Sequence, residues 1–257
     1  MSNFSLTLRD STTMLRRDFR HSLRNLTMTL SGLLTPTIMM LLFVYVFGGA
    51  IGASLHGASY VNYVAPAIIL MTVGSGCATT AINLCMDMNE GIINRFRTMA
   101  ISRASVLTGQ VLGSLIRTII TIVLILGVAL LIGFRPTTSP IAWIKALGII
   151  ALFTFAITWM GVVFGMIGKT PAGANSLSLI FQLLLPFTSS AFVSPDSMPV
   201  GIRWFARYQP FTPVIDTLRG LLLGTPPGNS ALLAVAWCVA LALLGYLWAR
   251  AIYNRTS

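Results

Sequence analysis

The amino-acid sequence predicts an all-α polytopic membrane protein whose 257 residues form a single transmembrane domain, 1–257. Hydrophobic residues make up 55% of the chain and charged residues only 9%, whereas soluble domains carry about 25% charged residues. Long intervals without charge also occur, the longest between Arg24 and Asp87. These observations exclude a soluble globular domain, because so few charges cannot coat its surface.

Six apolar stretches are long enough to span a bilayer, which takes about 20 mostly apolar residues per helix. The interval between Arg24 and Asp87 holds two of them, separated by a tight turn at His56 and Gly57. The predicted transmembrane helices are 33–54, 61–85, 105–134, 146–168, 172–194 and 230–249. An even number of spans places both chain ends on one side of the membrane.

The charge balance orients these spans. Lys and Arg number 17 against six acids, for a net charge of +11. Most of them flank the spans on the side that carries the chain ends, and cytoplasmic loops are the ones enriched in Lys and Arg. We therefore expect a multi-pass protein of the bacterial plasma (inner) membrane with both termini cytoplasmic. No soluble basic module is present, so nucleic acid is not an expected partner.

The N-terminal segment 8–30 is predicted to be an amphipathic interfacial helix. Leu15, Phe19 and Leu23 begin an apolar stripe at helical spacing, and Arg16 and Arg20 lie beside it. A basic amphipathic helix of this kind lies along the membrane surface with its cations at lipid phosphates. A solvated leader would leave the apolar stripe unexplained.

The segment 88–103 is the only long hydrophilic loop on the predicted cytoplasmic side. Ile92, Arg95, Phe96 and Met99 recur at helical spacing, so a short helix would present Phe96 and Met99 together. Such an exposed apolar pair framed by arginines is typical of a protein-docking surface. A solvated loop whose apolar residues rest on the bilayer is the other interpretation, and composition leaves both open.

The segment 197–224 is predicted to form a re-entrant helical hairpin on the outer face. Pro199 and Pro213 suit the first turns of two short helices, about 199–208 and 213–223, with a break at Gln209-Pro210. Gly224 suits the end of the second helix. The aromatic residues here suit the lipid headgroup depth; they are Trp204, Phe205, Tyr208 and Phe211.

Asp216 and Arg219 lie three residues apart in the second of these helices. Residues at that spacing share one helix face, so the two side chains can pair. Pairing lowers the cost of bringing two charges toward lipid. The spacing therefore favours a hairpin that dips into the membrane over a free loop.

The pattern of polar residues predicts no catalytic, cofactor or metal site. All six acids lie outside the spans, which argues against a proton-coupled carrier, an embedded protease and a zinc enzyme. Cys77, Cys85 and Cys238 lie in apolar runs without metal-ligand spacing. Residues 165–170 end like a nucleotide-binding loop, but Val163 occupies a position that requires glycine. We therefore expect a non-enzymatic chain that does not bind ATP itself.

Small residues at four-residue spacing permit close helix packing. They are Gly161 with Gly165 and Gly109 with Gly113. Such pairs are common in membrane helices, so tight packing within one subunit is the preferred interpretation.

Two blocks of residues resemble the membrane subunits of type 2 ABC exporters, and most closely the daunorubicin-resistance permease subfamily. The first block is Glu90-Gly91, Arg95-Phe96-Arg97-Thr98-Met99 and Gly109; the second is Met198-Pro199, Pro210-Phe211-Thr212-Pro213, Arg219 and Gly224. With six spans and a basic leader, the likeness covers nearly the whole chain. The chain departs from many relatives at Ala100, where they carry proline, and at Gln209-Pro210, where they carry Asn-Pro.

The resemblance implies a permease that dimerises with a second copy or a sister permease and docks two cytoplasmic ABC ATPase subunits, which bind ATP and Mg. In the family, the loop corresponding to 88–103 is the coupling helix, and the outer hairpin closes the exit. The implied ATPase-contact residues are Glu90, Gly91, Arg95, Phe96, Met99 and Arg103. The implied hairpin residues are Pro199, Pro210, Pro213, Asp216, Arg219 and Gly224.

Substrate would pass between two permease copies. Candidate path residues are polar or aromatic members of the first, second and fifth spans, namely Phe43, Tyr45, Phe47, Asn83, Gln182 and Phe187. Ordinary lipid-facing or packing roles for them remain open. A mainly apolar path favours export of hydrophobic or amphipathic drugs or lipids. The alternatives are a polysaccharide or glycolipid exporter and a non-transporting membrane scaffold.

Overall fold

The computed structural model describes residues 26–49, 60–90, 103–226 and 228–255, and every regular element within those ranges is helical. The α-helices are α2 (Leu26–Leu41), α4 (Tyr60–Asn89), α6 (Arg103–Ile132), α7 (Pro140–Ile167), α8 (Pro171–Leu179), α9 (Leu185–Phe187), α10 (Val200–Tyr208), α11 (Phe211–Leu223) and α12 (Asn229–Arg255). Two π-helical segments, η1 (Leu42–Phe47) and η3 (Ile180–Leu184), continue α2 and α8, and η4 (Pro195–Ser197) is a 3-10 turn.

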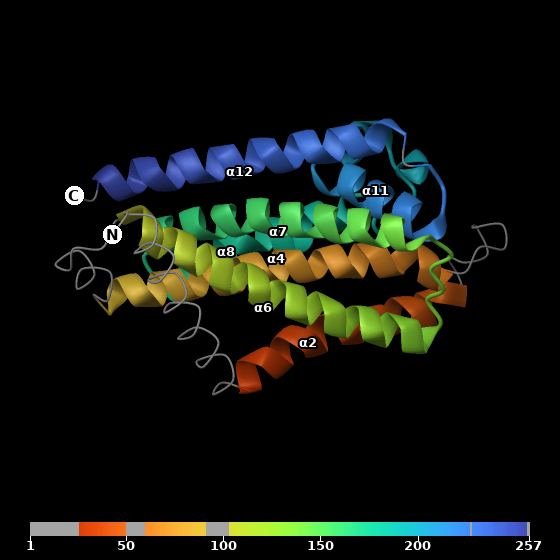
Figure 1. Ribbon diagram of the computed structural model, residues 1–257, viewed down its shortest axis with the longest axis horizontal. Helices are drawn as coiled ribbons and strands as arrows, with labels where there is room; N and C mark the ends of the chain where they lie inside the picture. The colour runs from red at the N-terminus through yellow and green to blue at the C-terminus, as the bar shows by residue number, and fades with distance from the viewer. Residues whose placement is uncertain (1–25, 50–59, 91–102, 227, 256–257) are drawn as a thin grey trace.

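The long helices lie side by side in one elongated bundle, with α10 and α11 at one end (Figure 1). Helices α4, α7 and α12 run away from that end, whereas α6 and α8 run toward it. Within the described residues, four helices are long and apolar enough to cross a membrane: Tyr60–Asn89, Gly109–Ile132, Pro140–Ile167 and Asn229–Ile252. Two shorter apolar helices cover Leu34–Phe47 and Pro171–Phe187.

The helix ends differ from the predicted spans at several places, since α2 already begins at Leu26 and α12 continues to Arg255. Helix α7 begins at Pro140 and not at 146, because the Ser139 side chain caps it by accepting a hydrogen bond from the Ala142 backbone N–H. The fifth predicted span, 172–194, is helical only as far as Phe187. Beyond it the Ser189 hydroxyl donates to the Pro186 carbonyl at 2.5 Å, and the chain turns. The end of the first predicted span and most of segments 8–30 and 88–103 lie outside the described residues.

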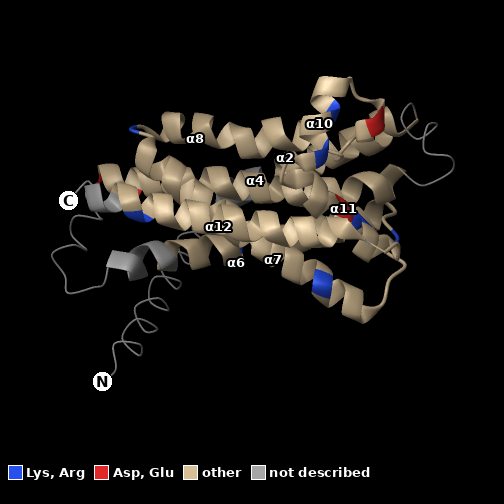
Figure 2. Cartoon of the chain, turned by 90° about the horizontal axis from the view of Figure 1, so that it is seen from above, with Lys and Arg blue, Asp and Glu red and all other residues tan. Residues whose placement is uncertain are grey.

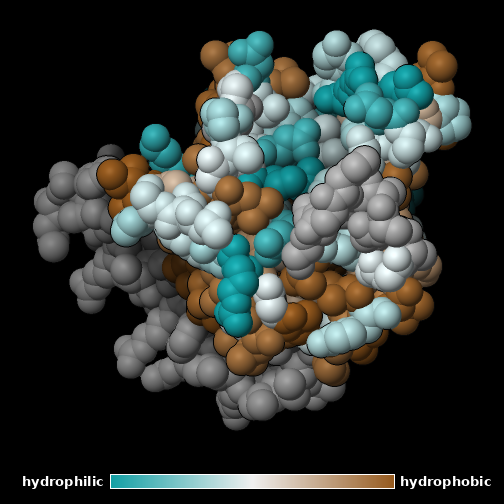
Figure 3. All heavy atoms as spheres, turned by 90° about the vertical axis from the view of Figure 1, so that its right-hand side faces the viewer, coloured by the Kyte–Doolittle hydropathy of each residue, from teal (hydrophilic) through white to brown (hydrophobic). Residues whose placement is uncertain are grey.

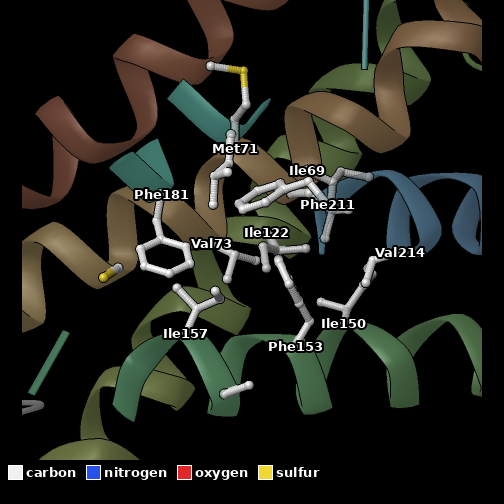
Figure 4. Packing of buried hydrophobic residues seen from close by; sticks show 14 of the residues in the cluster. Ile69, Met71, Val73, Ile122, Ile150, Phe153, Ile157, Phe181, Phe211 and Val214 are labelled. Carbon is white, nitrogen blue, oxygen red and sulfur yellow. The ribbon is translucent and has the colours of Figure 1, made fainter. Parts of the chain in front are cut away.

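The core surrounds α4, which is buried along most of its length (Figure 4). Ile69 and Val73 of α4 point into the same cluster as Ile157 of α7 and Phe181 of η3. Near the hairpin end, the rings of Phe153 (α7) and Phe211 (α11) meet edge to face at 5.0 Å. Van der Waals packing of this kind is what holds helices together where lipid removes the hydrophobic drive.

Glycines let α7 approach α4 closely. A Cβ added at Gly161 would lie 2.7 Å from the Cys77 carbonyl oxygen, and one added at Gly165 would lie 2.7 Å from that of Ala81. The two backbones therefore touch along this line. Gly161 and Gly165 therefore allow tight packing within one subunit, in agreement with the preferred interpretation of their spacing.

The outer surfaces of the bundle are strongly apolar. Leucines such as Leu131 on α6 and Leu232 on α12 are almost fully exposed, at 88% and 78%. Most Lys, Arg, Asp and Glu residues lie toward the two ends of the bundle, with uncharged helices between them (Figure 2). Apolar sides with charged ends fit a multi-pass membrane protein.

Candidate outer hairpin and translocation surface

Helices α10 and α11 are two short helices joined at Gln209-Pro210, but the second begins earlier than predicted. That they re-enter the membrane from the outer face stays a prediction. Helix α11 begins at Phe211, two residues before the predicted start at Pro213. Pro213 is tolerated there because the first N–H groups of a helix have no intrahelical acceptor. Gly224 ends α11 with a left-handed backbone (φ 77°), which glycine adopts without strain.

Arg219 of α11 connects three segments that are distant in sequence. Its Nη2 donates to the carbonyl oxygens of Tyr63 (α4) and Ser190, both at 3.1 Å. Its Nη1 donates to Asp216 Oδ1 at 3.0 Å, so these two residues pair as their spacing predicted. The guanidinium carbon also lies 3.8 Å from the centre of the Tyr63 ring, in cation–π contact. We call Arg219, Asp216, Tyr63 and Ser190 the polar hub.

The remaining hub bonds tie its members to each other. The Tyr63 hydroxyl donates to the Ser190 carbonyl oxygen at 3.0 Å, and the Ser190 hydroxyl donates to Asp216 Oδ1 at 2.8 Å. Burial raises the pKa of the Asp216 carboxyl, against the opposing effects of the Ser190 hydroxyl and the Arg219 guanidinium. Tyr63 and Ser190 were not predicted, because sequence spacing carries no signal for contacts across 127 residues.

The bend between the two helices is fixed by Gln209. Its side chain is buried at 3% exposure, and its Nε2 donates to the Leu185 carbonyl oxygen at 2.7 Å. Gln209 therefore joins the hairpin to the end of the η3–α9 helix. The Gln209 backbone N–H ends α10 by donating to the Phe205 carbonyl oxygen at 3.0 Å.

The aromatic residues of the hairpin divide into two groups. Trp204, Phe205 and Tyr208 are exposed on α10, and the Trp204 and Tyr208 rings lie 5.7 Å apart. Phe211 is fully buried against Phe153, so it packs inside the bundle and does not face outward with the other three. It follows directly on the Gln209-Pro210 break, and the bend turns it into the bundle. The depth of these residues in the membrane stays a prediction.

Three of the six candidate path residues come together near this end. Phe43 lies 5.5 Å from Phe47 and 6.3 Å from Phe187, between ring centres. Phe192, which was not predicted, stacks on Phe43 at 4.1 Å and lies 4.9 Å from Phe187. We call these four rings the aromatic cluster. Phe47 and Phe187 remain partly exposed, at 41% and 45%, so the cluster presents ring surface outside the subunit.

The other three candidate path residues lie apart from the aromatic cluster. Tyr45 is 69% exposed on η1. Gln182 of η3 donates to the Ser75 hydroxyl of α4 at 3.4 Å, and Asn83 is half-buried on α4. The structure therefore brings Phe43, Phe47 and Phe187 together but does not join Tyr45, Asn83 or Gln182 to them.

At the opposite end of the bundle, hydrogen bonds hold the helices that flank segment 91–102. Gln110 Nε2 of α6 donates to Asp87 Oδ2 of α4 at 3.0 Å, and Asn89 Nδ2 donates to the Lys169 carbonyl oxygen at 3.4 Å. Glu90 is exposed just after α4. Of the other implied ATPase-contact residues, Arg103 begins α6, and Gly91, Arg95, Phe96 and Met99 lie outside the described residues.

Comparison with known proteins identifies relatives along most of the chain. The family model for the ABC-2 type transporter matches residues 10–223. The daunorubicin resistance ABC transporter permease protein DrrB1 of Streptomyces coeruleorubidus is 28% identical over 192 residues, covering 75% of this chain and 67% of that protein. The probable doxorubicin resistance ABC transporter permease protein DrrC of Mycobacterium tuberculosis is 23% identical over 228 residues, 89% of this chain and 82% of that one. The putative transport permease ycf38 of Cyanophora paradoxa is 26% identical over 75% of this chain.

Proposed function

The chain belongs to the ABC-2 type transporter family, as a permease subunit, and we propose that it moves hydrophobic or amphipathic drugs or lipids out of the cell. Separate ABC ATPase subunits, two per complex, bind and hydrolyse the ATP. The permease works as a dimer, with a second copy or a sister permease, in the bacterial inner membrane. Its six spans include the two shorter helical segments, Leu34–Phe47 and Pro171–Phe187, and both termini face the cytoplasm.

The observation that carries this proposal is the arrangement around segment 91–102. The Gln110–Asp87 bond joins α4 and α6 beside this segment, and the Asn89–Lys169 bond joins α4 to the connection between α7 and α8. A force applied to the segment therefore acts on several helices at once. This is what coupling requires, because ATP-driven motion of a partner must reach the membrane helices as a rigid-body displacement.

The cargo class follows from the surface that the aromatic cluster presents. Phe47 and Phe187 expose apolar ring surface beside the rings of Phe43 and Phe192. Flat or amphipathic apolar molecules gain contact with such a surface at no cost in desolvated charge. The relatives named for daunorubicin and doxorubicin resistance support the same class.

Two specific features weigh against the alternatives. A polysaccharide exporter favours a wide aromatic-lined channel for sugar stacking. The fifth predicted span, 172–194, contains three phenylalanines. Phe181 and Phe192 are buried, so Phe187 is the one that exposes a ring on which a sugar could stack. A non-transporting scaffold gains nothing from a hairpin joined to the bundle through a buried guanidinium, whereas an exit closure needs a fixed position.

The test is ATP hydrolysis by the chain co-purified with an ABC ATPase encoded beside it. We expect the chain alone to lack activity and the complex to hydrolyse ATP faster than the free ATPase. Phe96→Asp removes the apolar docking surface and should abolish the stimulation. The matched control is Phe205→Asp, the same change on the exposed face of α10, which should leave it intact. Stimulation at the wild-type level by Phe96→Asp would refute the coupling assignment.

A further inference from the structure

The junction between the hairpin and the bundle differs from the rest of the protein in its hydrogen bonding. Among the described residues, three buried side-chain atoms have no partner within the protein: Tyr60 Oη, Gln209 Oε1 and Arg219 Nε. Arg219 belongs to the polar hub, the Tyr60 ring lies 6.3 Å from that of Tyr63 in a stacked arrangement, and Gln209 binds the end of α9. All three therefore lie where α10 and α11 meet the helices behind them.

Unpaired buried polar atoms are rare in native proteins, because each has given up its hydrogen bonds to water without gaining one in the protein. Their concentration at one junction contrasts with the close packing of α7 on α4, where Gly161 and Gly165 bring backbones into contact. Only water or a different arrangement of this junction can satisfy the three atoms. We therefore expect the hairpin to shift more easily at this junction than α7 could shift against α4.

Arg219 bonds to several sides of the junction at once. Its two Nη atoms hold carbonyl oxygens from α4 and from the turn at Ser190, and they also hold a carboxylate of its own helix. A guanidinium has five donors in a planar fork, whereas an ammonium is a point charge on a flexible stem. Lysine could not keep both carbonyl bonds and the stacking on Tyr63. The side chain is only 16% exposed, so outside water does not replace these bonds freely.

We propose that Arg219 is a positioning residue for the transport cycle: it holds the hairpin against α4 in the conformation described here, and the polar hub must rearrange each time the exit opens. This inference rests on the proposed function, because it takes the hairpin to close the outward path. Figure 3 shows the end of the bundle at which this would occur, with hydrophilic residues across its middle.

The experiment measures how accessible a buried residue of the hairpin itself becomes to a thiol reagent. Thr217 is 1% exposed on α11, and Cys77, Cys85 and Cys238 are buried, so Thr217→Cys introduces a thiol whose labelling reports hairpin opening. The full complex with its ATPase is placed in lipid nanodiscs and reacted with a hydrophilic maleimide, with and without ATP and Mg. We expect slow labelling without nucleotide and at least fivefold faster labelling during turnover.

Arg219→Gln should raise the nucleotide-free rate at least tenfold and remove its dependence on ATP, and Arg219→Lys should do so by a smaller factor. The matched control is Arg207→Gln on the same hairpin, because the ion pair of Arg207 with Asp196 is exposed on both sides. Arg207→Gln should change the labelling rate of Thr217→Cys less than twofold. A general loss of stability would raise the labelling rates with and without ATP together. Loss of the dependence on ATP therefore distinguishes a positioning role from lower stability.

The outcomes distinguish the inference from the function on which it rests. If the wild-type complex shows no stimulated ATP hydrolysis, the proposed function fails. If hydrolysis is normal but Thr217→Cys labels equally in the wild-type and Arg219→Gln backgrounds, the positioning role is refuted. Ser197→Cys, an exposed hairpin position, verifies in every variant that the maleimide reacts. If Arg219→Gln does not assemble, Arg219→Lys decides, and an unchanged rate there also refutes the role.

Discussion

Replacing Gly161 by alanine should loosen the α4–α7 contact. The added Cβ would lie 2.7 Å from the Cys77 carbonyl oxygen, and ordinary contact begins at 3.4 Å. The helices must therefore separate by about 0.7 Å (3.4 − 2.7) at this point, and the obstacle is backbone that cannot rotate away. Overpacking of this kind costs about 1–3 kcal/mol.

The same substitution also stabilises the helix itself, by about 0.5–1 kcal/mol, because glycine loses more backbone entropy than alanine on folding. Gly148 supplies the matched control. It lies in the same helix, and a Cβ there meets no atom within 4 Å. Gly148→Ala therefore stabilises the helix without a steric clash. The difference in free energy of unfolding between the two variants isolates the cost of overpacking.

The assay is thermal unfolding in detergent, followed by a thiol-reactive dye that reports exposure of the three buried cysteines. A domain of this size shifts its Tm by about 2–4 °C per kcal/mol. We expect Gly161→Ala to unfold roughly 2–12 °C below Gly148→Ala, as a 1–3 kcal/mol difference implies. Equal midpoints, or a higher one for Gly161→Ala, would show that the helices do not approach as closely as described.

Three further predictions use the same unfolding assay. Thr80 and Ser114 share a buried hydrogen bond between α4 and α6, so a double-mutant cycle of Thr80→Val and Ser114→Ala should give a coupling free energy of about 0.6 kcal/mol, up to about 1.7; a value of zero would contradict the bond. Phe192→Ala should lower stability by about 3 kcal/mol, because the ring is buried and stacked on Phe43, and a loss below about 1 kcal/mol would argue against the aromatic cluster. Gln209→Leu should cost about 1–3 kcal/mol, because it removes the donor to the Leu185 carbonyl at a buried site; a stability equal to that of the wild type would show that this bond does not fix the bend.

The long helices could be predicted because their signal is local. An uncharged stretch of sufficient length crosses a bilayer whatever its neighbours are, so 61–85, 105–134 and 230–249 correspond to α4, α6 and α12. The hairpin was also predictable, since Pro199, the Gln209-Pro210 break and Gly224 act through their own backbone geometry. The pairing of Asp216 with Arg219 followed from helical spacing alone.

The features that were missed depend on tertiary contacts. Apolar residues resume at Ala191-Phe192-Val193 after Thr188-Ser189-Ser190, so composition alone did not show that the hydroxyl groups of Thr188 and Ser189 stabilise a turn there. Phe211 has the composition of an interfacial residue, and only the bend beside it directs the ring to Phe153. The π-helical segments η1 and η3 likewise follow from packing, because their residues have no distinct propensity.

Contact between segment 88–103 and an ATPase that moves the helices can be tested by crosslinking. Phe96→Cys, as the only cysteine left in the chain, is treated with a thiol-to-lysine crosslinker on membranes containing the co-expressed ATPase. We expect a crosslinked product that contains one permease and one ATPase chain, formed only from the cytoplasmic side. A thiol at position 96 that reacts from the outside, or that crosslinks to no ATPase, would overturn the proposed coupling role.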